Sequence, residues 1–324
     1  MISLRGWPRR FAALLLGGVA VLALPPIHLW IFLVPGFVGL AWLIDGSQVS
    51  KKRRNSRFTD WPSWSAFTVG WWFGVGFFAA GLYWVSFSFL VDAEKFAWMI
   101  PFVFLGLPAG LALYTGLTSL ATYLTSSGGS RRLLTLALWW VIFEWIRGWA
   151  LTGFPWNLLG TVWTVSESMI QVTAVTGVYG LSLVTVLAAV SPALLGEDRI
   201  PLAKRLSMIF VTWALLVIVW TGGLTRLNGA TEANIDGVRL RLVQPNIAQR
   251  DKWKQKFRRH HFDRLLRLST ELNDITAPAP THIIWPETAT PFFLSSDQKA
   301  LTVISNVVPI DGAVLTGAPR QTHS

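Results

Sequence analysis

The hydrophobic positions of this sequence divide it into a long apolar part and a shorter mixed part. A helix must be long enough to cross about 30 Å of hydrocarbon to span a membrane. Apolar runs of nearly that length or more fall at residues 11–24, 27–44, 65–90, 97–124, 133–150, 168–195 and 206–222. Pro25 and Pro26 separate the first two runs, which indicates a hairpin. The pattern predicts a polytopic α-helical membrane bundle of about seven spans within residues 1–224.

Beyond residue 224 the pattern changes to that of a water-soluble domain. Residues 225–236 are predicted to be a linker and residues 237–324 a separate domain. Val238–Val243 alternates apolar and charged positions with the period of a strand. The elements expected after it are a helix near 252–273, a strand at His282–Trp285, a helix near Gln298–Val307 and a strand at Ala313–Thr316. This order predicts the start of an α/β domain with right-handed crossovers.

The composition supports a membrane protein. Of 324 residues, 52% are hydrophobic and only 14% are charged, and the mean hydropathy is +0.46. Soluble globular proteins rarely show this balance. The 19 Trp and 20 Phe side chains are typical of aromatic belts at two membrane interfaces, with the remainder in the core.

The basic residues orient the predicted helices. The formal net charge is +11. Basic residues collect in short loops on one side of the predicted bundle, at Arg5, Arg9 and Arg10, at Lys51, Lys52, Arg53, Arg54 and Arg57, at Arg131 and Arg132, and at Arg199, Lys204 and Arg205. By the positive-inside rule the N-terminus is cytoplasmic, and an odd number of spans places the chain after Gly222 outside. We expect no nucleic-acid partner, because no basic and aromatic surface module is visible.

Glu144 and Arg147 are candidate functional residues of the membrane part. An ionisable pair three residues apart on a spanning helix either lines a polar site or forms a structural ion pair near the outer interface, and both alternatives stay open. Gly153 and Pro155 break the helix directly afterwards. Irregular backbone at membrane depth is tolerated only against protein or a cavity, so we expect a lipid-accessible cleft here.

Two pairs of glycines have the spacing that lets membrane helices approach closely. These pairs are Gly70 with Gly74, and Gly106 with Gly110. They predict helix packing and no chemistry.

Glu287 is the candidate functional residue of the soluble part. It follows the predicted strand His282–Trp285, and catalytic groups of α/β sheets collect at the carboxyl ends of strands. A carboxylate partly buried there can act as a general base, although such a residue also serves as a helix cap or ion-pair partner. The chain has no Cys, which excludes disulfides, thiolate metal sites and a thiol nucleophile within these residues. No metal site or cofactor is expected: His260 and His261 are adjacent on a basic helix without a further ligand at suitable spacing, and no nucleotide-binding glycine loop is present.

These residues together resemble a known family. In the membrane part the likeness is carried by Glu144-Trp145-Ile146-Arg147-Gly148 and Phe154-Pro155-Trp156-Asn157-Leu158-Leu159-Gly160. In the soluble part it is carried by Gln244-Pro245-Asn246-Ile247, Gln249, Lys252-Trp253, Trp285-Pro286-Glu287-Thr288-Ala289 and Leu315-Thr316-Gly317-Ala318. The chain resembles the bacterial apolipoprotein N-acyltransferases, membrane members of the nitrilase (carbon-nitrogen hydrolase) superfamily, and the likeness covers essentially its whole length.

The resemblance implies a transfer of an acyl chain in two steps. The chain leaves a phospholipid for an active-site cysteine, and the thioester is then attacked by the α-amine of the lipidated N-terminal cysteine of an apolipoprotein. In family terms Glu287 is the general base, and Trp253 lies near the acyl-binding pocket or acts as an interfacial anchor. Arg147, Glu144 and Trp156 fall where the membrane half forms a lipid entry groove. The implied partners are a phospholipid donor, an apolipoprotein acceptor and membrane lipids, in the bacterial inner membrane with the soluble domain periplasmic.

The sequence departs from the family at its end. The family's lysine, nucleophilic cysteine and final membrane helix all lie downstream of Ser324. We therefore expect a fragment of a complete enzyme, or an interrupted reading frame, with only three strands of a larger sandwich. The alternative functions are a membrane-tethered amidase of the same superfamily, which would share Glu287, and a small-solute transporter, which would leave the soluble part unexplained.

Overall fold

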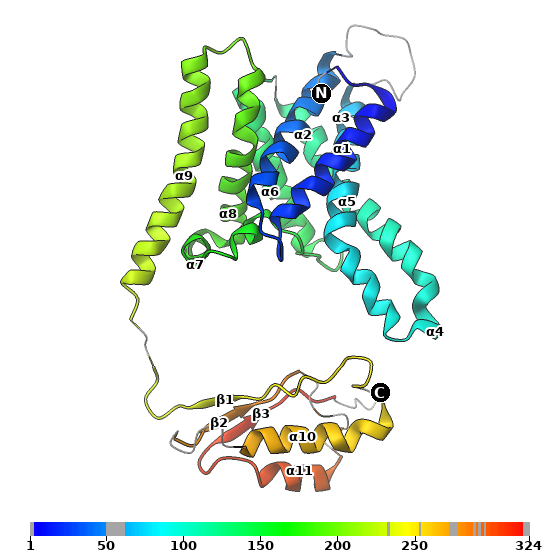
Figure 1. Ribbon diagram of the computed structural model, residues 1–324, viewed down its shortest axis with the longest axis vertical. Helices are drawn as coiled ribbons and strands as arrows, with labels where there is room; N and C mark the ends of the chain where they lie inside the picture. Colours follow the sequence, from blue (N-terminus) through cyan, green and yellow to red (C-terminus); the bar gives the residue numbers. More distant parts are fainter. Residues whose placement is uncertain are drawn as a thin grey trace. The chain divides into compact units, whose positions relative to one another are not determined.

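The chain folds into two compact units, Met1–Ala230 and Thr231–Ser324. The computed structural model describes residues 3–49, 62–126, 128–231, 234–252, 254–271, 278–287, 290, 293–294 and 296–319. The first unit is a bundle of helices (Figure 1). Its α-helices are α1 (Gly6–Ala20), α2 (Leu33–Val49), α3 (Pro62–Leu82), α4 (Ala93–Phe96), α5 (Ile100–Thr125), α6 (Ser130–Trp149), α7 (Glu167–Ile170), α8 (Thr173–Val190) and α9 (Leu202–Asn228). Its 3₁₀ helices are η1 (Val21–Ala23), η2 (Trp30–Phe32), η5 (Tyr83–Leu90), η6 (Ala97–Met99), η7 (Leu159–Trp163) and η8 (Ser191–Gly196).

Five helical segments of the described chain are long and apolar enough to cross a membrane. They are Trp30–Ser47, Ser63–Leu90, Ala93–Thr125, Thr173–Gly196 and Leu202–Asn228. Two of the seven predicted spans are not among them. The first, at residues 11–24, overlaps α1, which has only 15 residues. The fifth coincides with α6, which has 20 residues but includes the charged side chains of Arg131, Arg132, Glu144 and Arg147. The last helix of the first unit, α9, continues to Asn228, so it includes the first residues of the predicted linker.

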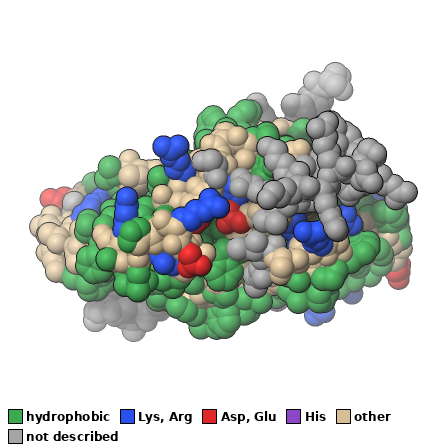
Figure 2. Space-filling view, turned by 90° about the horizontal axis from the view of Figure 1, so that it is seen from above, with side chains coloured by type: hydrophobic (Ala, Val, Ile, Leu, Met, Phe, Trp, Pro, Cys, Tyr) green, Lys and Arg blue, Asp and Glu red, His purple; other side chains and the backbone are tan. Residues whose placement is uncertain are grey.

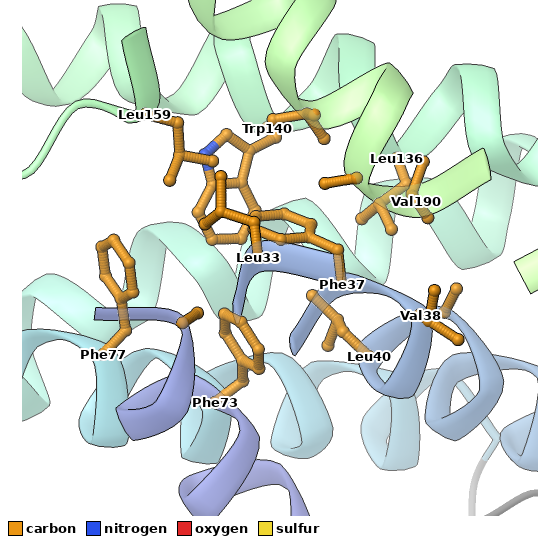
Figure 3. Packing of buried hydrophobic residues seen from close by; sticks show 14 of the residues in the cluster. Leu33, Phe37, Val38, Leu40, Phe73, Phe77, Leu136, Trp140, Leu159 and Val190 are labelled. Carbon is orange, nitrogen blue, oxygen red and sulfur yellow. The ribbon is translucent and has the colours of Figure 1, made fainter. Parts of the chain in front are cut away.

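Aromatic side chains from three helices form the centre of the first unit (Figure 3). Phe37 of α2, Phe73 and Phe77 of α3 and Trp140 of α6 are all buried. The ring of Phe37 lies edge-on to that of Trp140, with 4.7 Å between the centroids. Such edge-to-face contacts add to the free energy of area burial. Trp140 also connects this core to the candidate residue Glu144, because its indole N–H donates to the Glu144 carboxylate.

Glycines allow α3 to pack directly on α5. A Cβ atom at Gly74 of α3 would lie 2.9 Å from Cα of Ala112 of α5, and one at Gly70 would overlap Ser119 of α5. The predicted packing role of Gly70 and Gly74 is therefore confirmed. The same prediction is wrong for Gly106 and Gly110, where a Cβ would meet no described atom within 4 Å, because the α4 end of α5 projects from the bundle (Figure 1).

These two environments give a matched test of helix packing. Gly74→Ile is expected to destabilise the helical unit by about 1–3 kcal/mol, because the added side chain forces α3 away from α5. Gly110→Ile makes the same chemical change on an open helix surface and should leave stability unchanged. Thermal unfolding in detergent compares the two variants, and equal melting temperatures would contradict the close α3–α5 contact.

The second unit is a parallel three-stranded sheet with helices on one face. The strands β1 (Leu240–Leu242), β2 (His282–Ile284) and β3 (Ala313–Leu315) lie in the order β1-β2-β3, and both neighbouring pairs are parallel. The connections contain η9 (Gln255–Phe257), α10 (Arg258–Thr270) and α11 (Gln298–Ser305). The predicted order of strands and helices is confirmed, and the coarse class of a helical membrane bundle followed by a small parallel sheet is observed.

The two faces of the sheet differ in what covers them. Ile283 and Trp285 point to the helices and pack in a buried cluster with Phe262 and Leu265 of α10. On β1 it is Arg241 that lies on the helix side, where its guanidinium donates to the carbonyl of Ser269 at 2.7 Å. On the opposite face Leu240, Leu242 and Leu315 are exposed, and Ile284 between them is half-buried.

Candidate functional site

Glu144 and Arg147 of α6 are both buried, with 4% and 3% of their surface exposed. They do not form an ion pair with each other in the described part of the chain. Burying a charged group without hydrogen-bond partners is costly, so the partners of these two residues decide what they do. Those partners lie in the segment that follows α6.

The backbone after α6 is held by these two side chains. Glu144 Oε1 accepts hydrogen bonds from the Leu159 N–H at 2.9 Å and from the indole of Trp140 at 3.1 Å. Arg147 Nη1 donates to the carbonyls of Phe154 at 2.8 Å and Trp156 at 2.6 Å. The carboxylate thus accepts a hydrogen bond from a backbone N–H, and the guanidinium donates hydrogen bonds to two backbone carbonyls. Irregular backbone at membrane depth needs such partners for its N–H and C=O groups.

The conformation of this segment depends on one glycine in particular. Gly153 has a φ of +74°, a region that other residues rarely adopt. A Cβ there would also lie 2.5 Å from the carbonyl oxygen of Gly148. The chain therefore folds back over the end of α6, where Phe154 N–H donates to the Arg147 carbonyl at 2.8 Å.

Trp156 is the exposed member of this group, with 53% of its surface accessible. Its ring lies 5.2 Å from that of Trp84 of η5, which is 41% exposed. The cavity beside Glu144 and Arg147 has a volume of about 10 Å³, roughly the space of one water molecule. Within the described helical unit, Trp156 thus offers the accessible surface of this group. The lipid-accessible cleft stays a prediction.

Glu287 lies just beyond the carboxyl end of β2. Trp285 positions this end, because its side chain is buried and its indole N–H donates to Ser269 Oγ of α10 at 2.8 Å. The Glu287 side chain itself is exposed, so the expected partial burial is not found, since the chain leaves the sheet after Trp285. Lys252 Nζ lies 3.5 Å from the Glu287 carbonyl oxygen.

Sequence analysis did not predict a role for two residues of these groups. Lys252 belongs to a recognised motif but had no predicted role, and Trp84 had no signal at all. Trp253 lies outside the described residues. No group of three or more His, Asp or Glu side chains able to hold a metal ion is found in the described ranges.

His261 makes the stability of the second unit depend on pH. Its side chain is buried in α10, and burial together with the neighbouring charge of His260 lowers its pKa from 6.5. Below that pH the unfolded chain binds a proton that folded His261 does not, so stability is lost as the pH falls through 6.5 towards the lower folded value. Melting curves between pH 5 and pH 8 should show this loss, and His261→Gln should remove it. His260→Gln, at the exposed neighbour, should retain most of the loss, because burial is the larger cause of the lowered His261 pKa. An identical pH profile for all three proteins would contradict the assignment.

The sequence of this chain matches that of a known protein family. Residues 16–191, more than half of the chain, match the family model described as "Apolipoprotein N-acyltransferase N-terminal domain". The chain belongs to the apolipoprotein N-acyltransferase family. Curated relatives named "Apolipoprotein N-acyltransferase" include one from Rhodopseudomonas palustris, 38% identical over 321 residues, which are 97% of this chain and 58% of the relative. Those from Brucella suis and Allorhizobium ampelinum are 37% and 38% identical over 99% of this chain and 59% of their own lengths.

The matched regions include both groups of candidate residues. The family model covers α6 and the backbone that Glu144 and Arg147 hold. The alignments with apolipoprotein N-acyltransferases extend over nearly the whole chain and so into the second unit. The chain spans about three-fifths of the length of these relatives.

Proposed function

We propose that this chain is part of an enzyme that transfers an acyl group from a phospholipid to the N-terminal diacylglyceryl-cysteine of apolipoproteins. This reaction is the last step of bacterial lipoprotein maturation. The observation that carries the proposal is the family membership, with 36–38% identity to several apolipoprotein N-acyltransferases along nearly the whole chain. The five apolar helices support a reaction at a membrane.

The proposed division of the chain is a membrane domain at 1–224, a linker at 225–236 and a partial nitrilase-like domain at 237–324. The parallel sheet with α10 and α11 on one face supports the last assignment. Its other face exposes Leu240, Leu242 and Leu315, as expected of a layer that packs on further strands in a sandwich.

The proposed chemistry is covalent catalysis in two balanced steps. A cysteine thiol, supplied by residues outside these 324, loses its proton to the Glu287 carboxylate, and the sulfur attacks the ester carbonyl of the phospholipid. The ester C–O bond breaks, and the lysophospholipid oxygen takes up the proton. The acceptor α-amine then attacks the thioester carbonyl, an amide forms and the C–S bond breaks. The proton that the amine nitrogen loses passes to the departing thiolate and restores the thiol. A lysine, also from outside these residues, stabilises the oxyanion, and no cofactor takes part.

The proposed topology has seven spans with a cytoplasmic N-terminus in the bacterial inner membrane. It adds α1 and α6 to the five apolar segments. Charges within α6 are compatible with a spanning helix, because Glu144 and Arg147 are buried and hydrogen-bonded. The domain after α9 would then be periplasmic.

The lipid donor is proposed to approach along the exposed indoles of Trp156 and Trp84, near the backbone that Glu144 and Arg147 hold. Trp253 is proposed to contact the acyl chain. In this arrangement Glu144 and Arg147 position the loop, and Trp156 provides the surface that meets lipid.

Labelling tests the proposed function. Membranes carrying a polypeptide of the relatives' full length receive a phospholipid with a labelled palmitoyl chain, followed by a diacylglyceryl-cysteinyl peptide. We expect the label first on the protein as a hydroxylamine-sensitive thioester and then on the peptide as an amide. A membrane-tethered amidase would release product from a soluble amide and take no label, and a transporter would move solute across vesicles without labelling. Either result would overturn the proposal.

A further inference from the structure

A pocket of about 550 Å³ opens at the end of the helical unit where α2 ends and α6 begins. Arg147 lies near the opposite end of α6, so this pocket is separate from the loop site. Figure 2 looks onto this end of the unit. It shows Lys and Arg side chains gathered with Asp and Glu, and hydrophobic side chains around much of the outer edge of the view. The volume of the pocket is within the range of small-molecule sites.

One ion pair in the pocket wall is already complete. The guanidinium of Arg132, with 1% of its side chain exposed, contacts the carboxylate of Asp45. It also donates to the Ser126 carbonyl at 3.3 Å. Asp45 is therefore neutralised within the protein and is not available to a ligand.

Three other charged residues that line the pocket have no such partner. Arg131, Arg199 and Glu197 form no ion pair within the described residues. Arg131 and Arg199 are exposed at the rim. Besides the Arg132–Asp45 pair, the described residues that line the pocket thus present two positive charges and one negative charge.

This set of charges matches a zwitterion that contains a phosphate. Guanidinium groups bind phosphate oxygens through paired, charge-assisted hydrogen bonds. Helix α6 begins at Ser130 without a side chain that caps its first N–H groups, and an uncapped helix start adds to the attraction for an anion. A carboxylate such as Glu197 binds a primary ammonium.

The surface around the pocket favours a lipid over a free phosphate compound. Large apolar side chains next to the pocket residues are at least half exposed: Leu134 and Leu138 on α6, Leu195 on η8, and Leu202 and Leu206 on α9. In a membrane these side chains would contact acyl chains. Basic pockets between membrane helices commonly hold phospholipid headgroups.

We propose that this pocket binds the headgroup of an amino-bearing phospholipid, with the phosphodiester at Arg131 and Arg199 and the ammonium at Glu197. The bound lipid ties α6 to the segment between α8 and α9. It takes no part in acyl transfer, so the proposal does not depend on the proposed function.

Native mass spectrometry of the full chain in detergent tests the proposal. The probes are phosphatidylethanolamine, phosphatidylglycerol and inorganic phosphate. Arg131→Gln with Arg199→Gln should weaken phosphatidylethanolamine binding by about tenfold or more, because each charge-assisted bond contributes strongly. The control, Arg5→Gln with Lys204→Gln, removes two exposed charges from the same end but none from the pocket, and should bind like the wild type. Glu197→Gln should remove the preference for phosphatidylethanolamine over phosphatidylglycerol.

Each contrary outcome overturns a stated part of the proposal. Equal binding by the wild type and the Arg131 and Arg199 variant would remove the phosphate site. Displacement of the lipid by inorganic phosphate would mean that a free anion is the ligand. An unchanged lipid preference in Glu197→Gln would remove the ammonium contact. Should the double variant fold poorly, Arg199→Gln alone, at an exposed position, is expected to show a smaller loss in the same direction.

Discussion

Replacing Glu287 by Gln is expected to lower the rate of acyl-thioester formation by about 10²- to 10⁴-fold, the range that general-base catalysis contributes. The amide has nearly the shape of the carboxylate but cannot take the proton from the nucleophilic thiol. The variant is made in a polypeptide of the relatives' length, because these 324 residues contain no Cys. Intact mass after exposure to phospholipid measures the acylated fraction with time.

A matched glutamate separates loss of a base from loss of charge. Glu271 is an exposed residue at the end of α10 in the same unit, and Glu271→Gln should form the thioester at the normal rate. If Glu287→Gln also acylates normally, Glu287 is not the base. Because the Glu287 side chain is exposed, the substitution should leave the melting temperature unchanged, so a lost rate cannot be attributed to unfolding.

The order of elements in the second unit could be predicted because it depends on local periodicity. Alternation over Val238–Val243 and the run into Glu287 locate β1 and β2 without reference to the rest of the chain. Which face the helices cover could not be predicted in this way. The two-residue period of a strand assigns Leu240 and Arg241 to opposite faces of the sheet but does not say which face lies under α10. In the structure Arg241 lies on the α10 side, where it donates to the Ser269 carbonyl.

Glycine spacing shows the same limit in the membrane part. Gly70 with Gly74 and Gly106 with Gly110 have identical spacing, yet of these two pairs only at the first would a Cβ meet atoms of another helix among the described residues. The pattern says that a helix surface permits close approach. Whether a partner arrives depends on where the bundle ends along α5, which no short stretch of sequence records.

The importance of Glu144 and Arg147 could be predicted, but their partners could not. Burial of charge on an apolar helix has a high cost, which makes such residues visible in a sequence. Apart from the Trp140 indole, their hydrogen-bond partners are backbone groups of Phe154, Trp156 and Leu159. Every residue other than proline carries the same N–H and C=O, so the sequence contains no signal for this choice.

Arg147→Leu is expected to destabilise the helical unit by about 2–6 kcal/mol, because two buried carbonyls lose their donor at a cost of roughly 1–3 kcal/mol each. The carbonyls are those of Phe154 and Trp156, so the segment that presents Trp156 should also loosen. Thermal unfolding in detergent measures the stability, and the labelled phospholipid assay measures lipid access. Arg147→Lys keeps the charge but not the planar fork, and should recover only part of the loss. A melting temperature and a rate equal to the wild type would mean that Arg147 does not hold the loop.

A double-mutant cycle with Glu144→Gln divides the effect of Arg147 into its parts. If the positive charge of Arg147 offsets the buried charge of Glu144, removing both charges should cost less than the sum of the two single changes. If the two costs simply add, the carbonyl contacts alone account for the effect. Gln at position 144 can still accept from the Leu159 N–H, so the cycle leaves that hydrogen bond in place while it removes the negative charge. Coupling would make the charged pair one unit that fixes both ends of the segment from Phe154 to Leu159, although the two side chains form no ion pair with each other in the described part of the chain.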